Sequence, residues 1–198
     1  MSKSNTSIAG ILLAAGNSIR MGRPKALLTF NGVSFIDTIL NNLQSSGYQP
    51  IISILGEAGD TICECTSVNN YECWYNSNPQ EGMLSSLKIA IEHLPQECEG
   101  FVLALVDHPA VHRLTYQKLF ESAAAAPDRI IIPQFYGKKG HPVYFGRRYF
   151  QQLLDTPNEQ GARIVVHRNH RDIYFMPVED AAILQDIDTP EEYQFLIH

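Results

Sequence analysis

The sequence of 198 residues contains little cysteine, and its cysteines form no recognisable pattern. The four are Cys63, Cys65, Cys73 and Cys98; no two have Cys-x2-Cys spacing, and none is combined with histidine as in a zinc site. A disulfide framework and a structural zinc site are therefore not expected. Because Cys63 and Cys65 alternate, we expect them on opposite sides of a helix or loop and not as a redox or metal pair. Reduced thiols of this kind are typical of a cytoplasmic protein.

Basic side chains and long apolar runs are also scarce. Lys and Arg number 15 against 21 Asp and Glu, which gives a formal net charge of -6. Nucleic-acid-binding proteins usually carry a basic excess or a basic stripe, so nucleic acid is not expected as a partner. No apolar run approaches the ~20 residues of a membrane-spanning helix, so no membrane partner is expected either.

The chain has no internal repeat, low-complexity segment or linker, and its 44% hydrophobic content is ordinary for a globular protein. We therefore expect one domain over residues 1–198. Apolar runs alternate with segments of helical periodicity, which predicts an α/β fold with a largely parallel sheet. Strands are predicted at 8–13, 50–55, 71–75, 101–106, 130–133, 141–145 and 172–176. Helices are predicted at 34–46, 57–67 (weakly), 83–94, 114–126, 147–154 and 161–169, and after the capping box at 189–192.

The two best-known phosphate-binding fingerprints are absent. A Walker A loop has four residues between its glycines and then Lys-Ser/Thr, whereas five residues separate Gly16 from Gly22 and Arg23 follows. A dinucleotide fingerprint needs Gly-x-Gly-x-x-Gly, and only Gly16 is present. Asp37 lies where the ribose-binding acid of that fingerprint would be, but it is a weak signal by itself.

A different phosphate-handling loop is present at 13–25, directly after the first apolar run. Leu13 ends the run, and the small residues Ala14, Ala15 and Gly16 would let a polyanion approach backbone N–H groups. Arg20 and Lys25 supply two cations in the same loop. The loop predicts a nucleotide-binding enzyme, and the alternative is a glycine-rich turn with surface cations.

Carboxylates follow a central strand and precede the last helix. Asp107 comes at the end of an apolar run without alternation, where open α/β sheets bind ligands, and Mg2+ prefers such oxygen ligands. Asp186 and Asp188 share one face if their segment is extended. We expect Asp186 to be the second metal ligand and Asp188 to be the weaker candidate. In the alternative reading, Asp107 caps a turn before Pro109 and the later acids only favour the start of a helix.

Three further segments contain candidate binding residues. The turn at 78–82 begins a predicted helix. The free backbone amides at the start of this helix, together with Gly82, Ser85 and Ser86, could bind a base or a sugar. A plain loop followed by a capped helix is an equally good interpretation of this segment. His141 begins a predicted strand, where it could contact an anion or could be only a turn residue. Arg163 follows Gly161-Ala162, and the histidines and arginines at 167–171 are better explained as a solvated helix face.

The first of these loops, Leu-Ala-Ala-Gly-x-Ser-x-Arg-Met-Gly-x-Pro-Lys, resembles the signature of the MobA-like nucleotidyltransferases, and most closely their molybdenum cofactor cytidylyltransferase branch. Four more segments resemble motifs of that family in the same order. They are Asn-Pro-x-x-Gly-Met-x-x-Ser, the metal motif Asp-x-Pro at 107–109, Gly-His-Pro-Val at 140–143 and Asp-Ile-Asp-Thr-Pro at 186–190. Gly161-Ala162-Arg163 also matches, but Asn158-Glu159 replaces the family's Gly-Asp.

This resemblance implies a three-layer α/β/α, Rossmann-like fold of the nucleotide-diphospho-sugar transferase type, with a mostly parallel mixed sheet. It implies Mg2+-dependent transfer of CMP from CTP to a molybdopterin-bound cofactor, with pyrophosphate released and a molybdoenzyme as a possible recipient. Ala15, where guanylyl-transferring relatives tend to have glycine, favours cytosine. The implied catalytic residues are Arg20, Lys25 and Asp107; His141 and Arg163 would bind the acceptor. A sugar- or polyol-phosphate nucleotidyltransferase and a non-catalytic nucleotide- or cofactor-delivery module remain alternatives.

Overall fold

The computed structural model describes residues 7–16 and 21–197, and its main element is an eight-stranded sheet. The strands are β1 (Ile8–Ala14), β4 (Ile51–Leu55), β5 (Glu72–Tyr75), β6 (Gly100–Leu105), β7 (Ile130–Phe135), β8 (Lys138–Lys139), β9 (Val143–Gly146) and β10 (Ile173–Pro177). Their order is β10-β7-β9-β6-β1-β4-β5, with β8 paired to β7. Seven of these strands match predicted ones to within a few residues.

The sheet is mixed but mostly parallel. Strand β1 is parallel to both of its neighbours, so that Leu12 lies between Ser53 of β4 and Ala104 of β6. Strands β4 and β5 are parallel, as are β7 and β10. Strand β9 runs antiparallel to β6 and β7, between which it lies. The carboxyl ends of β1, β4 and β6 therefore meet at one edge of the sheet.

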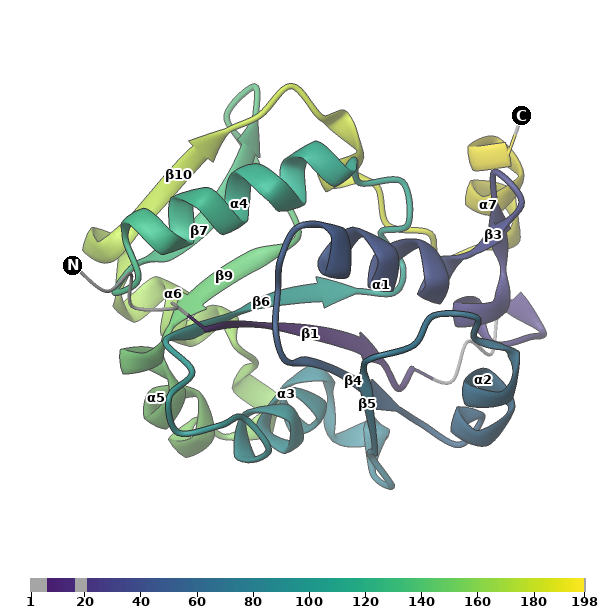
Figure 1. The fold of residues 1–198 in the computed structure, drawn as a ribbon, viewed down its shortest axis with the longest axis horizontal. Helices are drawn as coiled ribbons and strands as arrows, with labels where there is room; N and C mark the ends of the chain where they lie inside the picture. Colours follow the sequence, from purple (N-terminus) through teal and green to yellow (C-terminus); the bar gives the residue numbers. More distant parts are fainter. Residues whose placement is uncertain (1–6, 17–20, 198) are drawn as a thin grey trace.

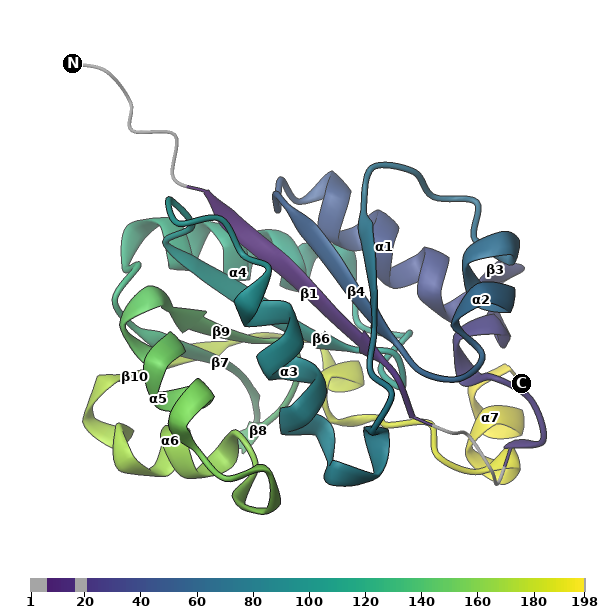
Figure 2. The same ribbon diagram turned by 90° about the horizontal axis from the view of Figure 1, so that it is seen from below.

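Helices cover both faces of the sheet, which confirms the predicted three-layer α/β/α fold. Helices α1 (Phe35–Ser45) and α4 (Arg113–Ala125) lie on one face, and α3 (Met83–Glu92), α5 (Phe150–Asp155) and α6 (Arg163–Arg168) lie on the other (Figures 1 and 2). Helices α2 (Gly59–Cys65) and α7 (Pro190–Ile197) lie beyond the end of the sheet where β1 and β6 finish (Figure 1). The short 3-10 helices are η2 (Lys25–Leu27), η3 (Pro79–Glu81), η4 (Arg147–Tyr149), η5 (Asn158–Gln160), η6 (His170–Asp172) and η7 (Ala181–Leu184).

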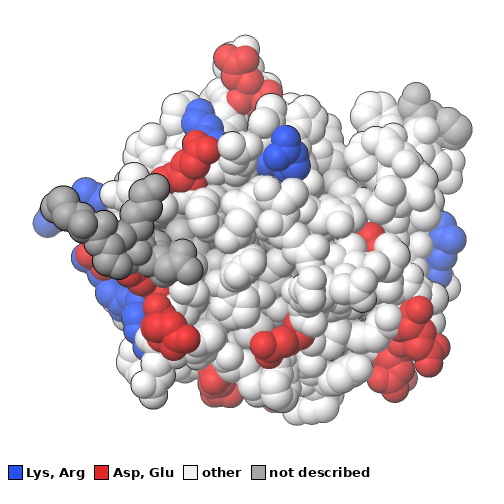
Figure 3. All heavy atoms as spheres, viewed as in Figure 1, with Lys and Arg blue, Asp and Glu red and all other residues white. Residues whose placement is uncertain are grey.

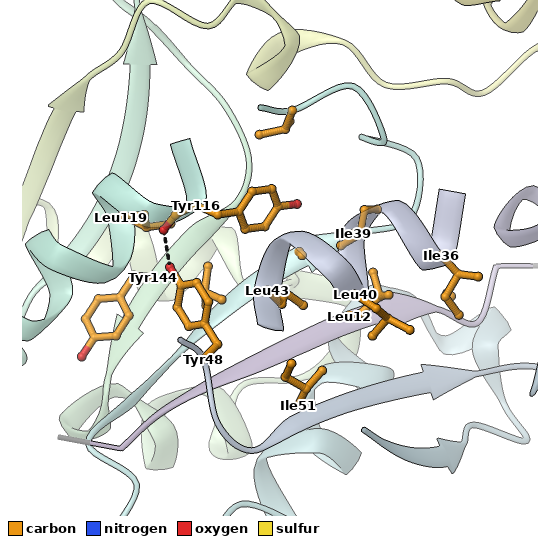
Figure 4. Packing of buried hydrophobic residues seen from close by; sticks show 14 of the residues in the cluster. Leu12, Ile36, Ile39, Leu40, Leu43, Tyr48, Ile51, Tyr116, Leu119 and Tyr144 are labelled. Atoms are coloured by element: carbon orange, nitrogen blue, oxygen red, sulfur yellow. Dashed lines mark hydrogen bonds between the residues drawn. The ribbon is translucent and has the colours of Figure 1, made fainter. Parts of the chain in front are cut away.

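Each face of the sheet buries its own hydrophobic cluster. Figure 4 shows the cluster under α1 and α4, where Leu40 and Leu43 of α1 pack on Leu12 of β1. Burial of such a side chain contributes about 1.5–3 kcal/mol relative to leaving it in water. The hydroxyl of Tyr48 donates a hydrogen bond of 3.0 Å to the carbonyl of Tyr116, which satisfies a buried polar atom (Figure 4). The resulting rigid sheet fixes the positions of the loops that leave it.

Capping residues satisfy backbone groups at the ends of two helices. The side chain of Ser34 accepts from the Asp37 N–H and caps α1, and Gly47 follows that helix with φ +93°. At α7 the Thr189 hydroxyl accepts from the Glu192 N–H, and the Glu192 carboxylate accepts from the Thr189 N–H. This reciprocal pair is the predicted capping box.

A short hairpin, β2 (Thr29–Phe30) and β3 (Val33–Ser34), is absent from the predicted elements. Two-residue strands are too short to show a period of two. The turn itself carries a signal, because Asn31 has φ 52° and Gly32 has φ +81°, the left-handed conformations that an Asn-Gly hairpin turn requires. The hairpin continues the cation-bearing loop toward α1.

Charged side chains are mixed on the face that Figure 3 shows. Lys and Arg are scattered there among Asp, Glu and a larger area of uncharged residues. Within residues 7–16 and 21–197, no helix is both long and apolar enough to cross a membrane.

Candidate active site

The ends of β1 and β6 are joined by a backbone hydrogen bond. The Val106 N–H donates to the Leu13 carbonyl at 3.1 Å. The turn after β4 lies equally close, because a Cβ on Gly56 would come within 2.5 Å of the Ala15 carbonyl oxygen. Only a glycine allows this approach without a shift of the backbone. Three strand ends thus form one continuous platform.

A cavity of about 380 Å³ lies over this platform. It is lined by Ala14, Gly16, Gly22, Arg23, Pro24, Lys25, Ala26, Gly56, Glu57, Ala58, Ile62 and Val106. Three of the predicted nucleotide-binding residues, Ala14, Gly16 and Lys25, share it. Leu13 and Ala15 are buried in the cluster on the opposite face of the sheet and do not line it. Arg20 lies outside the described residues.

Lys25 and two carboxylates form an electrostatic cluster beside this cavity. The Lys25 ammonium forms an ion pair with Asp188, and the side chain of Lys25 is 13% exposed against 44% for Asp188. Burial raises the pKa of Asp107; the charges of His108 and Lys25 oppose that rise, and Asp188 adds to it. The fold therefore brings together Lys25, Asp107 and Asp188 from the first, middle and last parts of the chain.

The segment that contains Asp186 and Asp188 runs beside the end of β6. The Ile187 N–H donates to the Asp107 carbonyl at 2.9 Å, and the Ile187 side chain is buried. Asp188 faces Lys25, whereas Asp186 is exposed and acts electrostatically on His141. The two acids therefore lie toward different parts of the site.

Asp107 has the features of a magnesium ligand. Its Oδ1 is buried and has no hydrogen-bond partner among the described residues. The Nε2 atom of His108 lies 3.8 Å from this oxygen. Within the described residues, no group of three or more His, Cys, Asp or Glu could hold a metal ion. Magnesium usually takes only one or two protein carboxylates and fills its octahedron with substrate phosphates and water. The donor set fits that mode of binding.

A second cavity, of about 400 Å³, lies on the other side of β6. His141 and Arg163 line it together with Asn158–Ala162 and a largely apolar wall: Met83, Leu84, Leu87, Leu103, Ile132, Val143, Phe145 and Val166. Burial, together with the charge of His108, lowers the pKa of His141 to about 4, so the ring is neutral at neutral pH. The rings of His108 and His141 lie 5.3 Å apart between centroids. The two predicted acceptor-binding residues therefore share one cavity.

The predicted residues at the start of α3 hold the local structure together. The Asn76 amide donates to the hydroxyls of Ser85 (2.8 Å) and Ser86 (2.9 Å), both of which are buried. Gly82 caps the helix with φ +94°. A further cavity of about 540 Å³ is lined by Asn76 and the following turn, and it shares Gly56 and Glu57 with the first cavity. Ser85 and Ser86 thus lie behind that cavity's wall.

Sequence reasoning missed the turn at 56–58, which lines two cavities. A signal for it exists, because Leu55-Gly56-Glu57-Ala58-Gly59 repeats the pattern of small residues after an apolar strand that singled out 13–16.

Asp37, considered as a ribose ligand, has another role. Its carboxylate accepts from the Ser67 hydroxyl at 2.8 Å and the Ser67 N–H at 3.2 Å, so it fixes the loop after α2.

Residues 10–173 match the MobA-like NTP transferase domain. The chain belongs to that family. Molybdenum cofactor cytidylyltransferase of Escherichia coli K12 is 28% identical over 92% of both chains. Nicotine blue oxidoreductase of Paenarthrobacter nicotinovorans is 25% identical over 96% of both chains. Family membership makes the chain a nucleotidyltransferase, and the resemblance to MobA-like proteins is confirmed.

Solved structures of similar fold cover nearly the whole chain. Rv0371c of Mycobacterium tuberculosis H37Rv is 26% identical and superposes with a TM-score of 0.87 over 97% of both chains. Its complex with manganese gives a TM-score of 0.83 at 26% identity, over 97% of this chain and 98% of that one. These two structures share the arrangement of sheet and helices described above.

Proposed function

We propose that this MobA-like chain transfers a nucleoside monophosphate, CMP from CTP, to a phosphate-bearing acceptor and releases pyrophosphate. The observation that supports this most strongly is the position of Asp107 and His108 between two cavities. Val106 lines the cavity that contains Lys25, and His108 lies 5.3 Å from His141 in the other. One cavity would hold the triphosphate and the other the acceptor, with their phosphates meeting at Asp107. We also propose that residues 1–198 act as one domain.

The reaction needs alignment and charge neutralisation more than proton transfer. An oxygen of the acceptor phosphate, already an anion, attacks the α-phosphorus, and the bond to the leaving pyrophosphate breaks. Backbone N–H groups beside Ala14 and Gly16, which line the cavity, would bind phosphate oxygens, and Lys25, with Arg20, would stabilise the charge on the α-phosphate and on pyrophosphate. Lys25 lines the cavity and is mostly buried, so water screens its charge little.

Asp107 and one of the later acids would hold Mg2+. Sequence reasoning preferred Asp186, but Asp188 faces Lys25 and raises the pKa of Asp107, so we propose Asp188 as the second ligand. The metal, when bound, would supply positive charge to the triphosphate oxygens. The Lys25 ammonium, paired with Asp188, neutralises part of the negative charge that the two carboxylates bring together. The manganese complex of Rv0371c supports a divalent ion without deciding between metals.

The apolar lining of the second cavity favours an acceptor with a large organic body over a sugar or polyol phosphate. Leu84, Leu87 and Phe145 offer no hydrogen bonds to sugar hydroxyls. A fused-ring pterin would bury its faces there, and Arg163, which lines the same cavity, would pair with negative charge on the acceptor. We therefore propose a molybdopterin-bound cofactor as acceptor and a molybdoenzyme as recipient. The four cysteines are free, which suits the reducing cytoplasm, where we propose the protein works.

Pyrophosphate release tests this proposal. The protein is incubated with Mg2+ and each of CTP, GTP, UTP and ATP, with a molybdopterin cofactor, a sugar phosphate or a polyol phosphate as acceptor. We expect pyrophosphate only when CTP and the molybdopterin cofactor are both present. Release with a sugar or polyol phosphate would favour that alternative. Nucleotide binding without pyrophosphate in any combination would indicate a delivery module, and oxidation or reduction of an added dye would point toward the chemistry named for the Paenarthrobacter relative.

A further inference from the structure

Two cysteines that are ten residues apart in sequence meet between α2 and β5. The Sγ atoms of Cys63 and Cys73 lie 3.0 Å apart, and both side chains are partly exposed. Cys65 is exposed on the same helix, whereas Cys98 is buried elsewhere. The spacing in sequence drew attention to Cys63 and Cys65, but the fold brings Cys63 to Cys73.

Helix α2 and strand β5 are held together at a second point, one turn from the two sulfurs. A Cβ on Gly59 would come within 2.4 Å of the Tyr75 ring, so the helix lies directly on that side chain. The Tyr75 hydroxyl donates to the Asp60 carboxylate at 3.0 Å. These contacts fix the start of α2 on β5 and keep Cys63 facing Cys73.

We propose that Cys63 and Cys73 are a reversible modification site, at which a peroxide converts the two thiols to an intramolecular disulfide. The Cys63 thiol gives up its proton, and its thiolate attacks one peroxide oxygen, so that the O–O bond breaks and a sulfenic acid forms. The departing hydroxide (for hydrogen peroxide) takes up that proton and leaves as water. The sulfur of Cys73 then attacks the Cys63 sulfur, forms the S–S bond and releases a second molecule of water. Two thiols are oxidised and one peroxide is reduced, and a dithiol reverses the change by thiol–disulfide exchange.

The order of attack follows from the surroundings of Cys73. Burial, together with its hydrogen bond to Cys63, raises the pKa of the Cys73 thiol to about 12. That thiol stays protonated at neutral pH and is the poorer first nucleophile. Cys73 therefore acts as the resolving cysteine. Disulfides formed in compartments that keep thiols reduced are usually transient and redox-sensing, which fits a reversible site.

Helix α2 connects the disulfide to the cavity of about 380 Å³ at the ends of β1, β4 and β6, which is the proposed nucleotide cavity. Ile62, next to Cys63, lines that cavity with Ala58, and both lie on or beside α2. Helix α2 also lies against η2, which begins at Lys25. A disulfide requires sulfurs about 2.0 Å apart, so the two sulfurs must approach by about 1 Å, and we expect part of that approach to come from a movement of α2 toward β5. We expect this movement of the cavity wall to raise the KM for the nucleotide, by on the order of tenfold.

Peptide mapping of the intact protein tests the modification itself. The protein is treated with hydrogen peroxide, free thiols are alkylated, and the peptides are identified by mass with and without dithiothreitol. We expect a Cys63–Cys73 cross-link that dithiothreitol removes. The matched control C65S keeps the cross-link, and C63S and C73S each lose it. A Cys63–Cys65 disulfide, a disulfide between two chains, or full alkylation of both Cys63 and Cys73 after oxidation would overturn the proposal.

The effect on the nucleotide rests on the proposed function and is measured separately. Thermal stabilisation by CTP with Mg2+ is compared for the oxidised and reduced protein, again with C65S as control. A weaker stabilisation of the oxidised protein alone supports the coupling, and equal stabilisation overturns it while the disulfide stands. Failure of the proposed function would show differently, as absence of pyrophosphate release from the fully reduced protein.

Discussion

The ammonium of Lys25 forms an ion pair with the carboxylate of Asp188 across a sequence separation of 163 residues. The pair joins the loop after the first strand to the segment before the last helix. A second contact reinforces it, because the hydroxyl of Tyr193 in α7 donates to the Thr29 carbonyl at 2.9 Å. A segment near the start of the chain and one near its end thus meet beside the cavity that Lys25 lines.

Replacement of Lys25 by Met is expected to lower kcat/KM for pyrophosphate release by about 10²–10³, because a preorganised charge at the phosphates is lost. Stability should change by less than about 1 kcal/mol, since Asp188 is 44% exposed and water can solvate it. Turnover and urea unfolding are the two measurements. Lys118→Met, on helix α4, is the matched control and should keep full turnover. An active Lys25→Met variant would remove Lys25 from the mechanism.

Replacement of Asp107 by Asn separates activity from stability. Burial raises the pKa of Asp107, which means that its ionised form is held at a cost in the metal-free protein. The neutral amide should leave the metal-free Tm unchanged or higher. Turnover, in contrast, should fall by at least about 10²-fold and should not recover at high Mg2+ concentration.

Asn has nearly the same shape as Asp but carries no charge, so the expected loss of turnover in Asp107→Asn comes from the lost charge. A fall in metal-free Tm of several degrees would instead assign Asp107 a structural role as a turn cap. Asp172→Asn, at an exposed ion pair with Arg148, is the matched control and should change neither turnover nor its dependence on Mg2+.

The free energy of unfolding should depend on pH through the protonation of His141. Its pKa is lowered to about 4 in the folded protein, mainly by burial and next by His108, while the backbone of Leu103 and the charge of Asp186 oppose the shift. Between the unfolded pKa, about 6.5, and pH 4 the unfolded chain takes up a proton that the folded chain does not. His141 therefore lowers the free energy of unfolding as pH falls through this window, by on the order of 3 kcal/mol.

Urea unfolding of the wild type and His141→Asn at several pH values measures this contribution. We expect the difference in unfolding free energy between the two proteins to change between pH 7 and pH 4, with the variant losing less stability. His167→Asn, at an exposed position on α6, should follow the wild type. Parallel pH profiles for wild type and His141→Asn would contradict the assignment.

The glycine after β4 gives a steric test. In Gly56→Ala the new Cβ would lie 2.5 Å from the Ala15 carbonyl oxygen, so the β1 and β4 ends must separate. We expect a loss of roughly 2 kcal/mol in stability and weaker nucleotide binding. Gly16→Ala is the comparison, because its Cβ meets no described atom within 4 Å. Gly16→Ala should fold as stably as the wild type, and equal loss in both variants would refute the steric account.

Much of the fold follows from local patterns in the sequence. Apolar runs and helical spacing predicted the order of most strands and helices, because burial on both faces of a sheet leaves a periodic signal. The antiparallel direction of β9 had no such signal, since periodicity carries no direction. The hairpin at 29–34 was missed because its strands are shorter than one period, although Asn31-Gly32 pointed to it.

The site was predictable where a motif follows a strand and less so where distant segments meet. The loop that ends at Lys25 and the position of Asp107 could be read directly, and the roles assigned to them stay predictions. The choice between Asp186 and Asp188 could not be made from alternation, which places both on one face. It depends on Ile187 being tied to the backbone of Asp107, a tertiary contact. The meeting of Cys63 with Cys73 likewise depends on how α2 lies on β5.

The hydrogen bond from the Ile187 N–H to the Asp107 carbonyl joins the segment before α7 to the end of β6. Because the Ile187 side chain is also buried, that segment cannot detach without exposing apolar surface to water. A local opening at α7 should therefore disturb the surroundings of Asp107 and the pairing of Lys25 with Asp188 at the same time. Amide hydrogen exchange at Ile187 would report how often that opening occurs.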